Sequence, residues 1–184
     1  MAKPKYSYEK FDDHCARVYG RNLPVSTKTS IEMCSFLKGK SVDKAIQILD
    51  DVLSFKQAVP FRRFTDGVGH RKGNMASGRY PQKLSTEMKI LLNSVKANAE
   101  VKGLSDSLKI VHLIAQKAST PFHQGRQRRR AMKRTHIELI VREDEFAKKQ
   151  TKKAPQTNNV EKKSEVKNIK SVSEKTSVQE GEQQ

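Results

Sequence analysis

Three stretches of the chain repeat apolar residues at the spacing of an amphipathic helix. The first begins with residues 29–32 (TSIE), which we interpret as a capping box, and ends before Gly39. The second follows Ser41, a candidate N-cap, and carries one apolar stripe over residues 42–53. The third and longest covers residues 84–99. Each predicted helix has one apolar face and therefore needs a layer to pack against.

That layer is predicted to be a small sheet. Residues 108–115 (LKIVHLIA) and 136–141 (HIELIV) are β-branched and apolar over lengths typical of strands. Residues 18–25 (VYGRNLPV) could add a third strand at an edge, where a proline is tolerated. If the first two strands pair as a hairpin, their connection of about 20 residues far exceeds the usual two to five. We therefore predict an α+β fold with three helices packed on a small three-stranded antiparallel sheet and a long projecting β-hairpin over residues 108–142.

Composition divides the chain into three parts. Among 184 residues, 37 are Lys or Arg and 20 are Asp or Glu, which gives a net charge of +17, and only 35% are hydrophobic. Residues 146–184 are rich in Lys, Glu, Ser, Gln and Asn and have few large apolar side chains, so we expect a disordered Lys/Glu-rich tail. We expect an extended N-terminal arm over residues 1–16 and one globular domain over residues 17–145.

Cysteine usage and hydropathy argue against several protein classes. Cys15 and Cys34 cannot by themselves build a disulfide framework or a four-ligand zinc site, so we expect a reducing compartment. No apolar run approaches 18 residues, and residues 1–10 are polar, so we expect neither a membrane span nor a secretory signal.

Motifs of catalysis are missing from the sequence. It contains no P-loop, GxSxG, HExxH or CxxC motif, and residues 67–73 (GVGHRKG) are a weak dinucleotide fingerprint because no predicted strand precedes them. The five histidines are scattered, and we expect His112 and His136 to be hydrogen-bonded sheet residues rather than ligands. We therefore expect no enzymatic activity, no metal and no cofactor.

The strong positive charge predicts a polyanionic partner, with nucleic acid as the first candidate. The densest basic run lies in the hairpin connection, between residues 117 and 134, where the sequence has no acidic residue. Its basic residues are Lys117, Arg126, Arg128, Arg129, Arg130, Lys133 and Arg134. Because like charges repel, we expect this run to become ordered only where phosphates surround its guanidinium groups. The alternatives are a disordered basic loop and a nuclear localisation signal.

A second basic segment without periodicity covers residues 55–83, and we predict that this loop also contacts RNA. Its candidate RNA-binding residues are Arg62, Arg63, Arg71, Lys72, Arg79 and Lys83. Phe61, Phe64 and Tyr80 lie beside these arginines, and aromatic rings in such a setting can stack on unpaired bases. The alternative is that the three rings fill the core beneath a long loop.

Several motifs occur together in one order along the chain. They are residues 57–64 (QAVPFRRF), 67–69 (GVG), 78–81 (GRYP), 98–104 (NAEVKGL) and 136–138 (HIE). Over about residues 5–145 the chain resembles the universal large-subunit ribosomal protein family numbered twenty-two in bacteria and seventeen in eukaryotes. The VPFRR and GRYP blocks resemble its archaeal and eukaryotic branch.

The resemblance implies a fold like the predicted one and a structural role in the large ribosomal subunit. The hairpin would line the nascent-peptide exit tunnel, and its tip would be formed by His123, Gln124, Gly125 and Arg126. The implied partners are large-subunit ribosomal RNA, neighbouring large-subunit ribosomal proteins and the nascent polypeptide chain, with no membrane. The implied location is the cytoplasmic ribosome, with a nuclear or nucleolar assembly stage.

Two other functions are weighed against this one. Residues 29–38 and 42–55 could form the helix-turn-helix of a free-standing nucleic-acid regulator, but Asp43, Asp50 and Asp51 beside Lys44 make the second helix a poor reader of a major groove. A nuclease or an RNA-modifying enzyme would need an acid/base constellation that the sequence does not supply.

Overall fold

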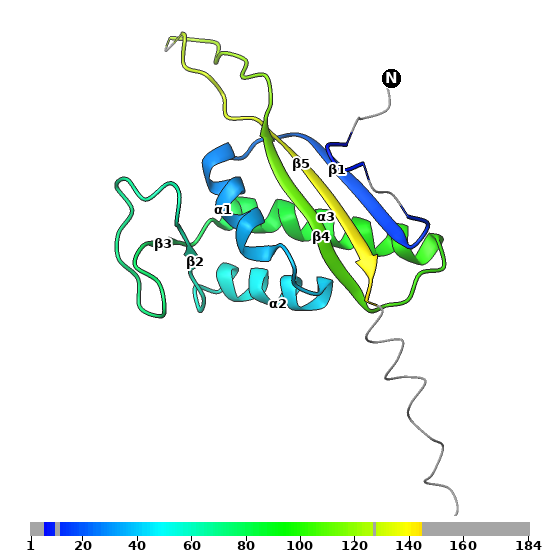
Figure 1. Ribbon diagram of the computed structural model, residues 1–184. Coiled ribbons are helices and arrows are strands. Elements are labelled where there is room, and N and C mark those ends of the chain that lie inside the picture. The colour runs from blue at the N-terminus through cyan, green and yellow to red at the C-terminus, as the bar shows by residue number, and fades with distance from the viewer. Residues whose placement is uncertain (1–5, 10–11, 127, 145–184) are drawn as a thin grey trace, which may run out of the picture. The chain divides into compact units, whose positions relative to one another are not determined.

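The computed structural model describes residues 6–9, 12–126 and 128–144 (Figure 1). The predicted tail over residues 146–184 lies outside the described residues, as does much of the predicted arm. The elements in chain order are β1 (Cys15–Leu23), α1 (Thr27–Leu37), α2 (Val42–Leu53), β2 (Val59–Pro60), β3 (Gly78–Arg79), α3 (Gln82–Val101), β4 (Leu108–Lys117) and β5 (Thr135–Glu143). The predicted α+β class, with three helices and a three-stranded antiparallel sheet, is confirmed.

β5 is the central strand of the main sheet, and β1 and β4 are its antiparallel neighbours. It pairs with β4 as far as Lys117↔Thr135, so both strands of the predicted hairpin are present and extend further than predicted. β1 is an edge strand, as predicted, but it begins at Cys15 rather than Val18. Cys15 and Ala16 are buried and paired with β5, so the last two residues of the predicted arm belong to the sheet.

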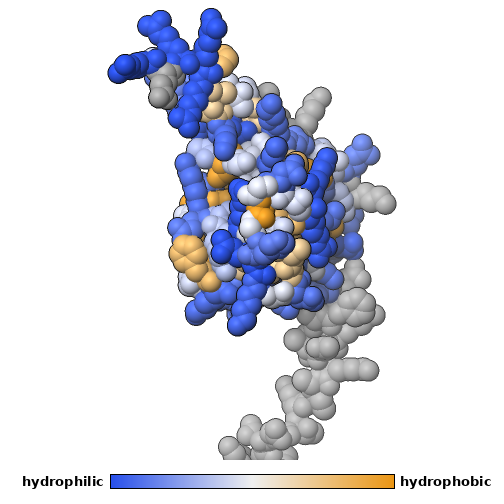
Figure 2. Space-filling model, turned by 90° about the vertical axis from the view of Figure 1, so that its left-hand side faces the viewer, coloured by the Kyte–Doolittle hydropathy of each residue, from blue (hydrophilic) through white to orange (hydrophobic). Residues whose placement is uncertain are grey.

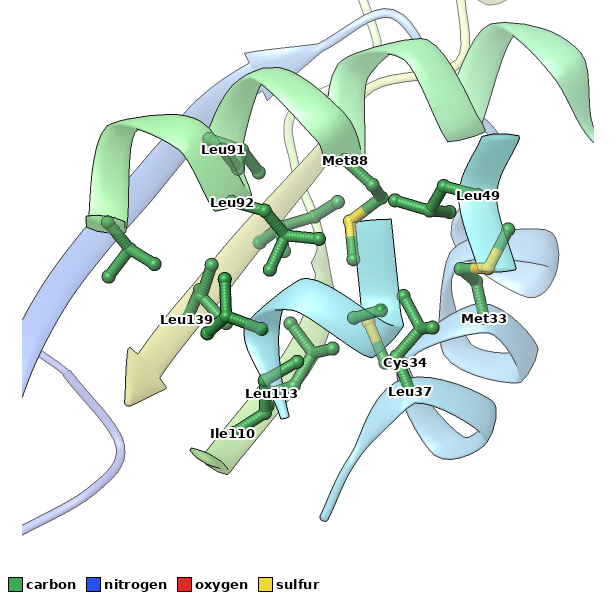
Figure 3. Close-up of a cluster of buried hydrophobic side chains, with 14 of the residues drawn as sticks. Met33, Cys34, Leu37, Leu49, Met88, Leu91, Leu92, Ile110, Leu113 and Leu139 are labelled. Atoms are coloured by element: carbon green, nitrogen blue, oxygen red, sulfur yellow. The ribbon is translucent and has the colours of Figure 1, made fainter. Parts of the chain in front are cut away.

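All three helices pack on one face of this sheet and form a single core with it (Figure 3). Successive strand residues point to opposite faces, which is why Ile137, Leu139 and Val141 of β5 enter the core together. Leu49 of α2 and Met88 of α3 are fully buried and meet them from the helical layer. The apolar stripes predicted from the sequence therefore form this helical layer.

α1 begins before the predicted capping box. Its N-cap is Ser26, so the interpretation of residues 29–32 as a capping box is wrong. Glu32 is 3% exposed, and its carboxylate accepts hydrogen bonds from the backbone N–H groups of Arg62 (3.2 Å), Arg63 (2.7 Å) and Phe64 (2.8 Å). The capping-box prediction fails because Glu32 binds the backbone of a loop far along the chain and not the N-terminus of its own helix.

The N-terminal segment lies on the opposite face of the sheet. The buried carboxylate of Glu138 accepts hydrogen bonds from the backbone N–H (2.9 Å) and the hydroxyl (2.6 Å) of Ser7, and from the side-chain amide of Gln116 (2.8 Å). The Ser7 hydroxyl also lies 3.1 Å from Nε2 of His112, whose ring is 5.2 Å from that of Tyr8. His112 is thus a hydrogen-bonded sheet residue, as predicted.

Candidate nucleic-acid interface

The basic loop between α2 and α3 is held to the body at two places. β2 and β3 pair at Pro60↔Gly78 and close the base of the loop, and Glu32 of α1 holds the backbone of residues 62–64 further out. The side chains that these contacts leave exposed include all six predicted RNA-binding residues of the loop: Arg62, Arg63, Arg71, Lys72, Arg79 and Lys83. The small β2–β3 sheet was not predicted.

The aromatic residues of the loop do not all face outward. Phe61 is 6% exposed, and Tyr80 is half-buried against the core, so the core-filling alternative holds for both rings. The Arg79 guanidinium carbon lies 5.7 Å from the centre of the Phe61 ring, and that of Arg71 lies 5.3 Å from the Tyr80 ring. Phe64 is only half-buried and remains a predicted stacking residue.

The hairpin continues beyond the regular strands as a paired ribbon. The backbone N–H of Ala118 donates to the carbonyl of Arg134 (3.1 Å), and that of Met132 donates to Pro121 (2.8 Å). Phe122 and Ala131 form a further antiparallel bridge. β4 and β5 fix the register that this ladder then follows. That the basic run becomes ordered only among phosphates stays a prediction.

The hairpin ends in a turn between Phe122 and Ala131, a stretch whose sequence has no acidic residue. The N–H of His123 donates to the carbonyl of Arg130 (2.8 Å), and Gly125 supplies a left-handed residue with φ of 98°. All four predicted tip residues lie within this turn and are exposed. Figure 2 shows hydrophilic residues gathered on this projecting end.

A cleft lies between the hairpin and the body, and we call it the hairpin cleft. Its lining residues are Pro24, Lys83, His123, Gln124, Arg130, Ala131, Met132, Lys133 and Arg134. Among these described residues none is acidic, and four carry a permanent positive charge. Arg134 is half-buried, and its Nη1 donates to the carbonyl of Asn22 (3.3 Å).

Lys133 also borders a second hollow, which joins the hairpin to the loop. This hollow is lined by Ser26, Lys28, Thr29, Phe61, Phe64, Asp66, Arg79 and Lys133. Neither α1 nor α3 has an acidic residue in its first turn, so the positive dipole ends at both helix N-termini add to the positive electrostatic potential here. The two basic segments, far apart in the sequence, therefore meet around Lys133.

The structure describes all thirteen predicted RNA-binding residues and brings only some of them together. Lys83, Arg130, Lys133 and Arg134 share the hairpin cleft, whereas Lys117 and the outer loop residues lie apart from it. Reasoning from the sequence missed Lys28 and Pro24, which line the two hollows. Both residues lie outside the two basic segments, and no periodic pattern indicates that they line these hollows.

The described residues contain no group of three or more His, Cys, Asp or Glu side chains placed to hold a metal ion. No helix of the described part is long and apolar enough to cross a membrane. Burial raises the pKa of the Cys34 thiol to about 12, so this residue is a neutral core side chain and not an activated nucleophile.

The helix-turn-helix alternative conflicts with the packing of its second helix. Lys89 of α3 lies 2.7 Å from the carboxylate of Asp50, and Lys96 lies 3.3 Å from that of Asp43. The polar edge of α2 is therefore paired with α3 rather than free to enter a major groove.

The sequence matches a known protein family over more than half of its length. The pattern of the family described as Ribosomal protein L22p/L17e matches residues 18–142. The chain belongs to this family. Large ribosomal subunit protein uL22 of Picrophilus torridus is 41% identical over 143 residues, which are 75% of this chain and 95% of that protein. The proteins of the same name from Methanococcoides burtonii and Methanocaldococcus jannaschii are 39% and 38% identical over 78% of this chain, and the matches cover 99% and 97% of those proteins.

The match to the L22p/L17e family includes both basic segments and the whole hairpin. The similarity to these three relatives agrees with the predicted archaeal and eukaryotic branch of the family.

Proposed function

We propose that this protein is a structural constituent of the large ribosomal subunit and that it binds ribosomal RNA. The observation that carries the proposal is the convergence of two basic segments around Lys133, at the acid-free hairpin cleft. Such a concentration of like charge is costly unless anions lie against it, and the phosphates of RNA supply them. Membership of the L22p/L17e family supports the choice of particle.

The mechanism is electrostatic and geometric. The core holds β4 and β5 in one register, so the hairpin leaves the body along a fixed path. Loop and hairpin then present their cations to several RNA segments, and each neutralised phosphate releases a counterion. Arginine suits this task because its planar fork can bind two oxygens at once.

The hairpin end is the part proposed to reach the nascent-peptide exit tunnel. The described residues of this turn, 123–126 and 128–130, are exposed, and ladder hydrogen bonds flank them, so the hairpin end can enter a confined passage without refolding. Under this proposal the tip residues face the nascent chain, while Arg128, Arg129 and Arg130 hold RNA. The other partners are neighbouring large-subunit proteins, and the location is the cytoplasmic ribosome, with assembly in the nucleolus.

The proposed role includes no catalysis. Among the described residues, the buried carboxylates Glu32, Glu138 and Glu143 each hold a loop or an arm through hydrogen bonds. Groups already engaged in this way are structural anchors rather than general acids or bases.

Sedimentation of a cell extract tests the proposal. At low salt the protein should move with the large ribosomal subunit, and washing at high salt should release it only in part, since buried arginine–phosphate contacts resist screening. A free pool that binds a defined DNA duplex would contradict the proposal and favour the regulator. Turnover of RNA by the pure protein would favour an enzyme.

A further inference from the structure

The hairpin cleft has a shape that RNA-backbone binding alone does not explain. Its volume is about 620 Å³, within the roughly 300–1,000 Å³ of pockets that hold small molecules. A surface that only follows a phosphate backbone can be convex, like the end of the hairpin. An open concave site of this size can receive one residue of a polymer.

The charged wall of the cleft is built from two separate elements. Lys83 comes from the first turn of α3, and Arg130, Lys133 and Arg134 come from the part of the hairpin that precedes β5. Arg134 is fixed in place by Asn22, as described above, and its Nη2 lies 3.9 Å from the sulfur of Met132. A phosphate entering the cleft would therefore find at least one donor already oriented.

The lining of the cleft is partly apolar. Pro24, Ala131 and Met132 are among its lining residues, and a bare inorganic anion would leave these side chains against water. A nucleobase, in contrast, has flat faces that pack on apolar and sulfur-containing side chains.

We propose that the hairpin cleft holds one unpaired nucleotide of RNA, with its phosphate on Lys83, Lys133 and Arg134 and its base on Met132. This inference rests on the proposed RNA binding and adds to it the class of nucleotide that the site selects. A base-paired duplex keeps its bases stacked inside and presents only phosphate and sugar, so it can lie against the rim but cannot fill the cleft.

The test uses the full-length protein and two short RNA stems. One stem carries a single bulged 2-aminopurine, and the other has the same 2-aminopurine paired. The bulged stem should bind about tenfold more tightly, the discrimination expected for one stacked base, and the fluorescence of its 2-aminopurine should change on binding. Lys83→Met should weaken binding of the bulged stem more than of the paired stem and so reduce this preference to less than about threefold. The reason is that only a nucleotide inside the cleft places its phosphate on Lys83.

Two further variants make the test specific. Lys44→Met removes an exposed lysine of α2 outside both basic segments and should leave the preference unchanged. Met132→Ser should weaken binding of the bulged stem and spare the paired stem, because it removes contact with the base and not with phosphate.

The outcomes separate this inference from the proposed function. Equal binding of both stems by the wild-type protein would overturn the inference and leave RNA binding intact. Displacement of the bulged stem by a poly-glutamate peptide as readily as by unlabelled bulged RNA would also overturn it, since the cleft would then be a general anion site. Failure to bind either stem would overturn both proposals.

Discussion

Glu32 is the side chain on which the position of the basic loop depends most. Its buried carboxylate bonds to three consecutive backbone N–H groups, at residues 62, 63 and 64. Glu32→Gln keeps the shape of the side chain, removes its charge and turns one acceptor into a donor that faces these N–H groups. We expect the loop to detach locally while the core stays folded.

The size of the effect follows from these contacts. A hydrogen bond to a charged group contributes about 1.5–3 kcal/mol, but the loop is partly exposed and water can replace some of the lost bonds. We therefore expect the closed loop to lose about 2 kcal/mol of stability relative to the open loop, which raises the population of the open loop roughly 30-fold. Cleavage by a protease follows that population when opening is fast.

Limited trypsin digestion measures this directly, because Arg62 and Arg63 are cleavage sites next to the anchored backbone. Glu100→Gln, at an exposed position of α3, is the matched control for loss of one negative charge. Glu32→Gln should be cut at the loop roughly 30 times faster than this control. Equal cutting rates for the two variants would refute the reasoning that the carboxylate holds the loop.

The other predictions concern charge, the chain end and a buried thiol. Affinity for ribosomal RNA falls as salt rises, and reversing the charge of Arg128, Arg129 and Arg130 together should make the slope of log affinity against log salt shallower by about 2. Filter binding measures this slope. An unchanged slope would mean that these arginines do not anchor RNA. Truncation after Gln150 should leave thermal unfolding cooperative, since the core lies within residues 12–144; a broad transition would show that the tail contributes to the fold. The pKa of the Cys34 thiol rises from 9.0 to about 12 on burial, so the folded state holds the proton more tightly and the associated stability is lost as the pH rises from about 9 towards 12. Chemical unfolding should show a smaller loss over that window for Cys34→Ala than for the wild type; equal losses would contradict this assignment.

The helices and the long strands could be predicted because each is marked by a pattern of apolar residues that extends over many positions. The stripe over residues 42–53 matches the bounds of α2, and the apolar runs around Ile110 and Leu139 form two paired strands. These signals come from many residues that must all face one core, so a single exception does not obscure them. The family resemblance then followed from short motifs in a fixed order.

The features that were missed depend on single contacts between distant residues. Glu32 fits a local capping motif, but its partners lie in the loop, and nothing in the sequence around it indicates this. Glu138 interrupts an apolar strand because Ser7 of the N-terminal segment covers it on the outer face of the sheet. β2 is only two residues long, which is too short for any periodicity.

The candidate site was predicted in composition but not in arrangement. Charge density alone located both basic segments. Their meeting at Lys133 depends on where α1 and α3 begin relative to the hairpin, which is a property of the packed fold. The burial of Phe61 has the same origin, because an aromatic beside arginines has the same local sequence whether it faces the core or a base.

The most direct test of the account is a cryo-EM map of the native large ribosomal subunit, traced through residues 117–135. We expect Arg128, Arg129, Arg130 and Lys133 to lie within hydrogen-bond distance of ribosomal RNA phosphates, and the hairpin end to border the exit tunnel. A hairpin that lies in solvent or against other proteins, with these side chains away from RNA, would contradict it.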